Sequence, residues 1–260
     1  MANYKPAATP MEERIKLSKQ STVEKVDTTR YRSIIGGLRW LTHTRPDITF
    51  AVGYVSRFME DPREDHWMAV KRVLRYIKGS VDQALVFPKG GGSDGGELEL
   101  AAFSDADMVG DVNGRRSTSG VLILLGAAPV AWQSLKQKTV ALSTCEAEYV
   151  AAATAACQLV WMRWLLGELT GIEPRPPALK VDNQPAIALA KNPVLHDRSK
   201  HIDVKFHFLR DCVEERQIVI EFVETGRQLA DIFTKSVGRL RFLELRSKIG
   251  MVEVKSKQQD

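Results

Sequence analysis

The chain has 260 residues, 44% of them hydrophobic, which suffices for one large or two modest packed domains and argues against wholesale disorder. Lys and Arg exceed Asp and Glu by 37 to 32, and this mild basic excess of +5 permits a nucleic-acid partner without requiring one. The three cysteines have no Cys-x-x-Cys spacing and no membrane span or signal core is recognised, which argues against a disulfide framework, a zinc knuckle and a membrane partner, and favours a reducing compartment.

The first part of the chain is predicted to be helical. Residues 1–26 are polar without a clear period and are interpreted as a tail. Residues 27–88 contain three patterns of apolar residues at helical spacing. Three basic side chains stack on one face of the third pattern, and they are candidate contacts to a nucleic-acid backbone or, alternatively, an ordinary solvated face: Lys71, Arg75 and Lys78.

The Gly-rich run 89–96 is the clearest linker, and the pattern changes after it to mixed α and β. Residues 97–251 read as about three strands, a long helix, a strand, helices, a strand and a last helix carrying LADIF; residues 252–260 form a second polar tail. Trp161 and Trp164 on the long helix are expected in the core. This order predicts an α/β fold, a mixed sheet with helices packed on it.

Four acidic residues occupy positions from which their carboxylates could converge in the folded chain. Asp105 and Asp182 each end a predicted strand. Glu148 falls on the alanine-rich stripe of the long helix, and Asp231 lies early in the last helix. Asp105, Asp182 and Asp231 can each be only a cap or turn residue, and Asp107 is interpreted as a solvated turn residue, with an acid that supports the site as the alternative. Several carboxylates buried together repel unless a cation lies among them, and paired Mg²⁺ ions suit phosphoryl transfer.

Long runs of the sequence resemble copia-type retrotransposon Pol polyproteins, from about residue 11 to about residue 251. After the linker, FSDADMVGD, VAWQSLKQKTVALSTCEAEYVAAA, LKVDNQPAIALAKNP and QLADIFTK resemble the family's ribonuclease H domain. Before it, YRSIIGGLRWLTHTRPDITFAVGYVSRFM resembles the end of the reverse transcriptase. The resemblance implies an RNase H-like mixed five-stranded sheet with flanking helices, preceded by a small helical segment like a reverse-transcriptase thumb or connection.

The same resemblance implies a ribonuclease H that cuts the RNA strand of RNA–DNA hybrids with two Mg²⁺ ions, for which Mn²⁺ can substitute. The family's four metal-binding acids fall on Asp105, Glu148, Asp182 and Asp231. By analogy, Asp105 bridges both ions and Asp231 helps to hold the ion that activates water. Glu148 and Asp182 hold the ion at the leaving 3′ oxygen. The implied partners are the hybrid and the upstream reverse-transcriptase palm of the same polyprotein, in the cytoplasm within a virus-like particle, or in the nucleus.

Other features of the resemblance set limits on this expectation. RSKHID resembles a family segment, in which Arg198, Lys200 and His201 are candidates for gripping phosphates; a solvated basic loop is the alternative. Met108 and Val109 replace the Trp-Ala that the family usually has. The polymerase's own acids lie upstream in the family, so no DNA synthesis is expected. The alternative function is a catalytically inactive, nucleic-acid-binding remnant of a decayed or domesticated polyprotein.

Overall fold

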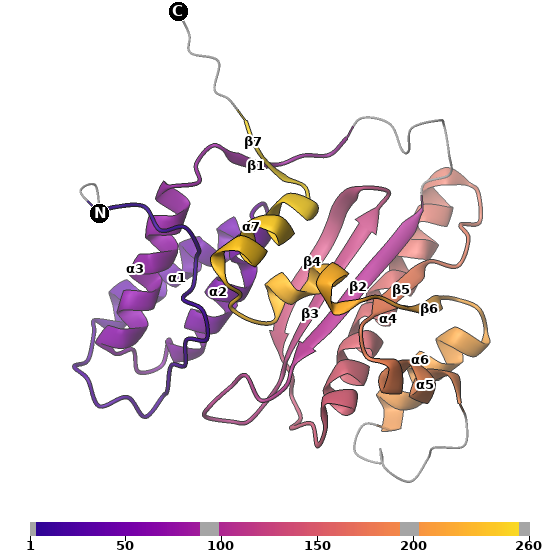
Figure 1. The fold of residues 1–260 in the computed structure, drawn as a ribbon, viewed down its shortest axis with the longest axis horizontal. Coiled ribbons are helices and arrows are strands. Elements are labelled where there is room, and N and C mark those ends of the chain that lie inside the picture. Colours follow the sequence, from indigo (N-terminus) through magenta and orange to yellow (C-terminus); the bar gives the residue numbers. More distant parts are fainter. Residues whose placement is uncertain (1–3, 89–98, 193–202, 255–260) are drawn as a thin grey trace, which may run out of the picture. The chain divides into compact units, whose positions relative to one another are not determined.

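The computed structural model describes residues 4–88, 99–192 and 203–254 (Figure 1). These residues form two compact units, a helical unit and a sheet unit. The helical unit comprises Met1–Val86, Val112–Gly114 and Lys235–Asp260, and the sheet unit comprises Phe87–Asp111 and Arg115–Thr234. The C-terminal segment from residue 235 therefore belongs with the helices, whereas the predicted second domain extended to residue 251.

The helical unit contains the three predicted helices and a C-terminal addition. Its elements are α1 (Thr28–Leu41), the 3-10 turn η1 (Pro46–Ile48), α2 (Thr49–Val55), η2 (Ser56–Phe58), α3 (Glu64–Lys78), β1 (Gln83–Leu85), α7 (Arg239–Lys248) and β7 (Met251–Glu253). β1 pairs with β7 in an antiparallel two-stranded sheet. The predicted N-terminal tail is instead packed within this unit, because Met11 and Leu17 bury their apolar side chains.

His66, in the first turn of α3, is fully buried and forms hydrogen bonds through both ring nitrogens. Its Nδ1 accepts from the backbone N–H of Arg63 at 3.0 Å, and its Nε2 lies 3.0 Å from the backbone oxygen of Ser18. The ring stacks on Phe58 at a centroid distance of 3.9 Å. These contacts fit the neutral tautomer with its hydrogen on Nε2, and burial lowers the pKa of His66 below its usual 6.5.

We therefore expect the helical unit to lose stability as the pH falls below about 6.5. In the unfolded chain His66 has its ordinary pKa and binds a proton at higher pH than in the folded chain, so the free energy of unfolding decreases with falling pH. Urea titrations at about pH 7.5 and about pH 5.5 measure this for the parent and for His66→Gln, which does not titrate there. The parent should lose more stability than the variant; equal losses would exclude His66 as the cause.

The sheet unit is built on five strands in the order β4-β3-β2-β5-β6. Their bounds are β2 (Leu100–Asp107), β3 (Thr118–Leu125), β4 (Ala128–Lys136), β5 (Ala178–Val181) and β6 (Val219–Phe222). β2, β3 and β4 are antiparallel neighbours, whereas β5 runs parallel to β2 and β6 runs parallel to β5. This arrangement confirms the predicted RNase H-like mixed sheet.

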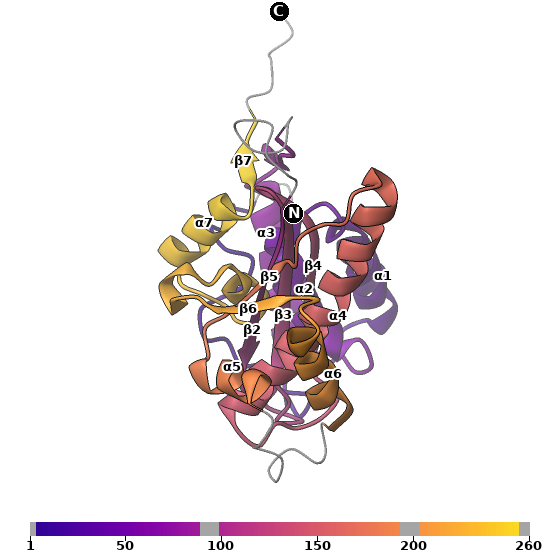
Figure 2. The same ribbon diagram turned by 90° about the vertical axis from the view of Figure 1, so that its right-hand side faces the viewer.

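Helices cover the sheet on both faces. They are α4 (Thr144–Thr170), α5 (Gln184–Lys191), α6 (Asp203–Glu214), and the 3-10 turns η5 (Thr225–Arg227) and η6 (Leu229–Phe233). Figures 1 and 2 show α4 on one face of the sheet and η6, the gold turn between β6 and α7, on the other. The predicted last helix carrying LADIF is thus the short turn η6, because the side chains of Gln228 and Thr234 anchor both of its ends to β2.

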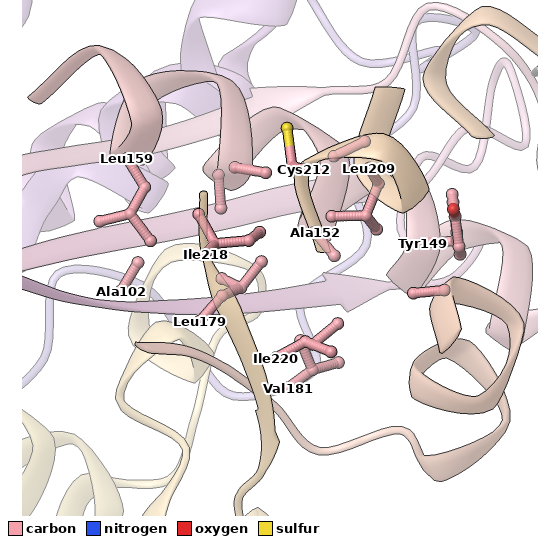
Figure 3. Close-up of a cluster of buried hydrophobic side chains, with 14 of the residues drawn as sticks. Ala102, Tyr149, Ala152, Leu159, Leu179, Val181, Leu209, Cys212, Ile218 and Ile220 are labelled. Atoms are coloured by element: carbon pink, nitrogen blue, oxygen red, sulfur yellow. The ribbon is translucent and has the colours of Figure 1, made fainter. Parts of the chain in front are cut away.

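The long helix α4 forms the core of the sheet unit. Ser143 caps its N-terminus by accepting a hydrogen bond from the backbone N–H of Glu146 at 3.1 Å. Small buried residues such as Ala152 let the helix pack closely on the sheet, and Leu159 and Ile220 belong to the same apolar cluster (Figure 3). This packing fixes the position of the first turns of α4 relative to β2.

Two properties of α4 differ from the sequence analysis. Trp161 and Trp164, expected in the core, are 53% and 61% exposed. They follow buried Leu159 by two and five residues, which turns them about 200° and about 140° around the helix axis, away from the sheet. By length and composition α4 also qualifies as a membrane span, with a mean hydropathy of 1.2 over 18 residues. However, its alanine-rich face packs in the core of this unit, as in the core helices of folded domains.

Candidate metal centre

Two neighbouring strands place Asp105 and Asp182 side by side. β2 and β5 are parallel, with Ser104 opposite Val181. The next residue in each segment is an aspartate, Asp105 within β2 and Asp182 just after β5, so both carboxylates lie close together on the same face of the sheet. Asp105 is only 2% exposed. The parallel pairing therefore brings together two acids that lie far apart in the sequence.

Glu148 completes the cluster from α4. It lies in the second turn of the helix and is 7% exposed. Gln137 holds this end of α4 to β3, because its Nε2 donates to the Ser119 hydroxyl and to the backbone oxygen of Ala147, both at 2.9 Å. One carboxylate oxygen each from Asp105, Glu148 and Asp182 lies within 4.8 Å of the other two.

This spacing suits a divalent cation. Two oxygens bound to one Mg²⁺ at about 2.1 Å lie no more than about 4.2 Å apart, so a small inward movement of the 4.8 Å cluster would bring all three into coordination. Without a cation, three carboxylates this close repel one another, and two of them are buried. The donor set is all oxygen, which favours Mg²⁺ or Mn²⁺ over metals that prefer nitrogen or sulfur.

Asp231, the fourth predicted acid, is buried in η6 and is not a member of this mutual cluster within the described ranges. Thr234 connects it to the site. The Thr234 hydroxyl hydrogen-bonds to the Asp105 carboxylate and lies 3.2 Å from the backbone oxygen of Asp231. The structure thus unites three of the four acids directly and places the fourth on a turn that contacts Asp105.

Met108 and Val109, which follow Asp107 in the sequence, differ from the usual family pattern. Met108 and Val109 are half-buried, and Val109 adopts a left-handed backbone with φ of 59°. A β-branched residue rarely occupies this conformation, because its side chain crowds the backbone. Asp107, interpreted from the sequence as a solvated turn residue, is instead a half-buried residue at the end of β2, outside the three-acid cluster.

Gly120 on β3 is a site residue that sequence reasoning missed. It pairs with Asp105 across the strands. A Cβ on Gly120 would lie 2.7 Å from Thr234 Cγ2, 2.8 Å from the backbone oxygen of Ala230 and 3.0 Å from Phe233 Cβ. Only glycine therefore lets η6 sit this close to β3, at the position opposite Asp105. The glycine of STSG was the available signal, but its spacing alone does not reveal a contact with a turn more than a hundred residues away.

We expect Gly120→Ala to destabilise the sheet unit by about 1–3 kcal/mol through overpacking against η6. Gly226→Ala is the matched control, because a Cβ there meets nothing within 4 Å. Urea unfolding followed by circular dichroism compares the two variants with the parent. If Gly120→Ala lowers the free energy of unfolding no more than Gly226→Ala does, η6 does not require a glycine at position 120.

The predicted nucleic-acid contacts have partners within the helical unit. Arg75 Nε donates to the backbone oxygen of Lys5 at 2.7 Å, and Lys78 Nζ donates to that of Tyr4 at 3.1 Å. Lys71 Nζ forms an ion pair of 3.0 Å with a glutamate on the same helix. Binding a phosphate through this stripe would require these contacts to be exchanged, and the stripe remains a prediction. The other predicted contacts lie outside the described residues: Arg198, Lys200 and His201.

The sheet order, with a carboxylate cluster contributed by the parallel neighbours β2 and β5 and by α4, defines a ribonuclease H-like domain. No family model matches the chain. It is 42% identical over 255 residues to the retrovirus-related Pol polyprotein from transposon RE2 of Arabidopsis thaliana, covering 98% of this chain and 17% of that protein. It is 41% identical over 258 residues to that from transposon TNT 1-94 of Nicotiana tabacum, covering 96% of this chain and 19% of that protein. The chain belongs to the copia-type retrotransposon Pol polyproteins and spans less than a fifth of these two relatives.

Solved structures with a similar fold have low sequence identity. One is LC11-RNase H1 in complex with an RNA/DNA hybrid, which is 15% identical, with a TM-score of 0.39, covering 52% of this chain and 94% of that chain. Another is the N-terminal RNase H domain of rv2228c from Mycobacterium tuberculosis, fused to maltose-binding protein. It is 12% identical, with a TM-score of 0.37, covering 58% of this chain and 98% of that chain.

Proposed function

We propose that this chain is an Mg²⁺-dependent ribonuclease H, which hydrolyses the RNA strand of RNA–DNA hybrids. The observation that carries the proposal is the convergence of three carboxylates, from β2, α4 and the end of β5, within 4.8 Å of one another. Family membership supports the same activity, since the sheet unit corresponds to the ribonuclease H region of the Pol polyprotein.

The side chains have distinct roles in this proposal. Asp105, Glu148 and Asp182 hold the metal, and burial of the first two keeps competing solvent away from their oxygens. When bound, Mg²⁺ supplies a nucleophilic water and neutralises charge on the phosphodiester and its leaving oxygen. Asp231, on η6, is proposed to contribute to a second ion. The expected products carry a 5′-phosphate and a 3′-hydroxyl.

Recognition of the hybrid is also part of the proposal. Glu148 is proposed to contact a ribose 2′-hydroxyl, the group that distinguishes RNA from DNA. The partners proposed from the family are the RNA–DNA hybrid and the upstream reverse-transcriptase palm. The cytoplasmic or nuclear location stays a prediction.

A cleavage assay tests the proposed function. The full chain is incubated with an end-labelled RNA–DNA hybrid, single-stranded RNA, or duplex DNA, with Mg²⁺, Mn²⁺, or a chelator. We expect only the RNA of the hybrid to be cut, and only when a divalent ion is present. Binding of the hybrid without cleavage under all conditions would instead favour the inactive nucleic-acid-binding remnant.

A further inference from the structure

Gln228 is a fully buried amide that joins the candidate metal centre to η6. Its Nε2 donates to the backbone oxygen of Ser104 at 2.8 Å, and its Oε1 accepts from the backbone N–H of Ala230 at 3.1 Å. Ser104 immediately precedes Asp105, and Ala230 immediately precedes Asp231. The Gln228 side chain therefore links the backbone next to Asp105 to the backbone next to Asp231. These two predicted metal ligands are separated by more than a hundred residues.

Thr234 makes a second connection at the other end of η6. Its side chain is buried, and its hydroxyl hydrogen-bonds directly to Asp105 Oδ2 while lying 3.2 Å from the Asp231 backbone oxygen. A threonine hydroxyl has one hydrogen and accepts others, so it can restrict the rotation of the Asp105 carboxylate without adding charge. The two contacts hold η6 to β2 at its beginning and at its end.

The surroundings of η6 make this attachment rigid. Gly120 lets the turn pack closely on β3, because an added Cβ would lie 2.7 Å from Thr234 Cγ2. The apolar side chains of η6, including Ile232 and Phe233, are buried. We call Gln228, Thr234 and Gly120 together the η6 clamp.

We propose that Gln228 and Thr234 are positioning residues, which fix the Asp105 carboxylate and the main chain of Asp231 relative to each other and thereby set the metal affinity of the site. This inference rests on the proposed function, because it assumes that Asp105 binds the metal. Polar groups that orient metal ligands commonly change affinity or activity by about 10–100-fold when they are removed.

A pair of substitutions at Thr234 separates positioning from packing. Thr234→Val keeps the shape and removes the hydroxyl, whereas Thr234→Ser keeps the hydroxyl and removes a methyl group. Gln228→Met removes both amide contacts at similar length. Gln158→Met on α4 is the control, because Gln158 lies ten residues from Glu148, about 15 Å along the helix axis.

Two readouts are measured for each variant, well below its melting temperature. The first is cleavage of the hybrid, giving kcat, KM and the Mg²⁺ midpoint. The second is Mn²⁺ binding without nucleic acid, followed by electron paramagnetic resonance of the free ion. We expect Thr234→Val and Gln228→Met to lower kcat and weaken both metal responses by about tenfold or more, with KM for the hybrid nearly unchanged. Thr234→Ser and Gln158→Met should resemble the parent.

The outcomes distinguish this inference from the proposed function. If the parent binds Mn²⁺ and cuts the hybrid, but Thr234→Val and Gln228→Met match it in both readouts, the clamp is refuted and the nuclease stands. Equal losses in Thr234→Val and Thr234→Ser would also refute it, because packing alone would then explain them. If the parent binds Mn²⁺ without cutting, weaker binding by Thr234→Val still supports the clamp while the nuclease fails. If the parent does neither, both proposals fall.

Discussion

Replacing Asp105 by Asn will reduce cleavage of the RNA–DNA hybrid by about a thousandfold or more, the rate equivalent of the several kcal/mol that a catalytic metal contributes. Asp105 lies on β2 within reach of both Glu148 and Asp182, so its loss removes one of the three ligands of the cluster. Asn has nearly the same shape, and it also removes one of three mutually repelling charges. The folded state should therefore be retained without metal.

Asp107→Asn is the matched control for this experiment, because Asp107 lies two residues further along β2, is half-buried and is outside the cluster. Its activity should stay within a few-fold of the parent. Cleavage and hybrid binding are measured on the same preparations, and binding should persist in both variants. If Asp105→Asn cuts as fast as the parent, the observed activity comes from another site or from a contaminating nuclease.

The second large effect concerns the helical unit, where Asp47→Ala should destabilise the fold by about 3–5 kcal/mol. The Arg45 guanidinium donates to both carboxylate oxygens of Asp47, at 2.8 and 2.7 Å, and the side chains are 8% and 0% exposed. Tyr76 also donates to Asp47 at 2.5 Å, and Arg246 of α7 donates to the Tyr76 hydroxyl at 3.1 Å. Truncating Asp47 leaves a buried guanidinium without its counter-charge.

A pair of similar chemistry at the surface gives the comparison. Arg63 and Asp61 are also two residues apart and 2.8 Å from each other, but their side chains are 21% and 45% exposed. Solvent screens such pairs, so Asp61→Ala should cost much less than Asp47→Ala. Hydrogen exchange of the α2 and α3 amides in the full chain reports on this unit separately from the sheet unit. Similar losses in the two variants would show that the buried pair contributes no more than the exposed one.

The sheet unit was largely predictable because its signals are local. Strand alternation before Asp105, the alanine-rich face around Glu148 and the short strand before Asp182 each mark an element and the end at which an acid lies. Parallel pairing of β2 with β5 then brings two of these acids together. The roles of the individual acids came from the family resemblance and not from these patterns.

Other features depend on contacts that no local pattern encodes. Met11 and Leu17 lie in a polar stretch without periodicity, yet both are buried within the helical unit. The C-terminal segment joins the same unit through β1–β7 pairing and through Phe242, whose ring packs edge-on against Tyr76 at 5.5 Å. Such long-range pairings are selected by tertiary packing.

The turn η6 shows the same limit at the site. A last helix was predicted around LADIF, because the local sequence does not report which distant groups anchor the ends of a short turn. The contacts of Gln228 and Thr234 with β2 connect residues more than 120 apart in the sequence. The acids were visible in the sequence, whereas the groups that orient them became visible only in the fold.

Anomalous scattering from a crystal of the chain grown with Mn²⁺ tests most directly whether the three carboxylates form a metal centre. We predict a peak bounded by Asp105, Glu148 and Asp182, at coordination distance from an oxygen of each, and its loss in Asp105→Asn. Full occupancy elsewhere on the protein, with no peak among these three side chains at saturating Mn²⁺, would contradict the account.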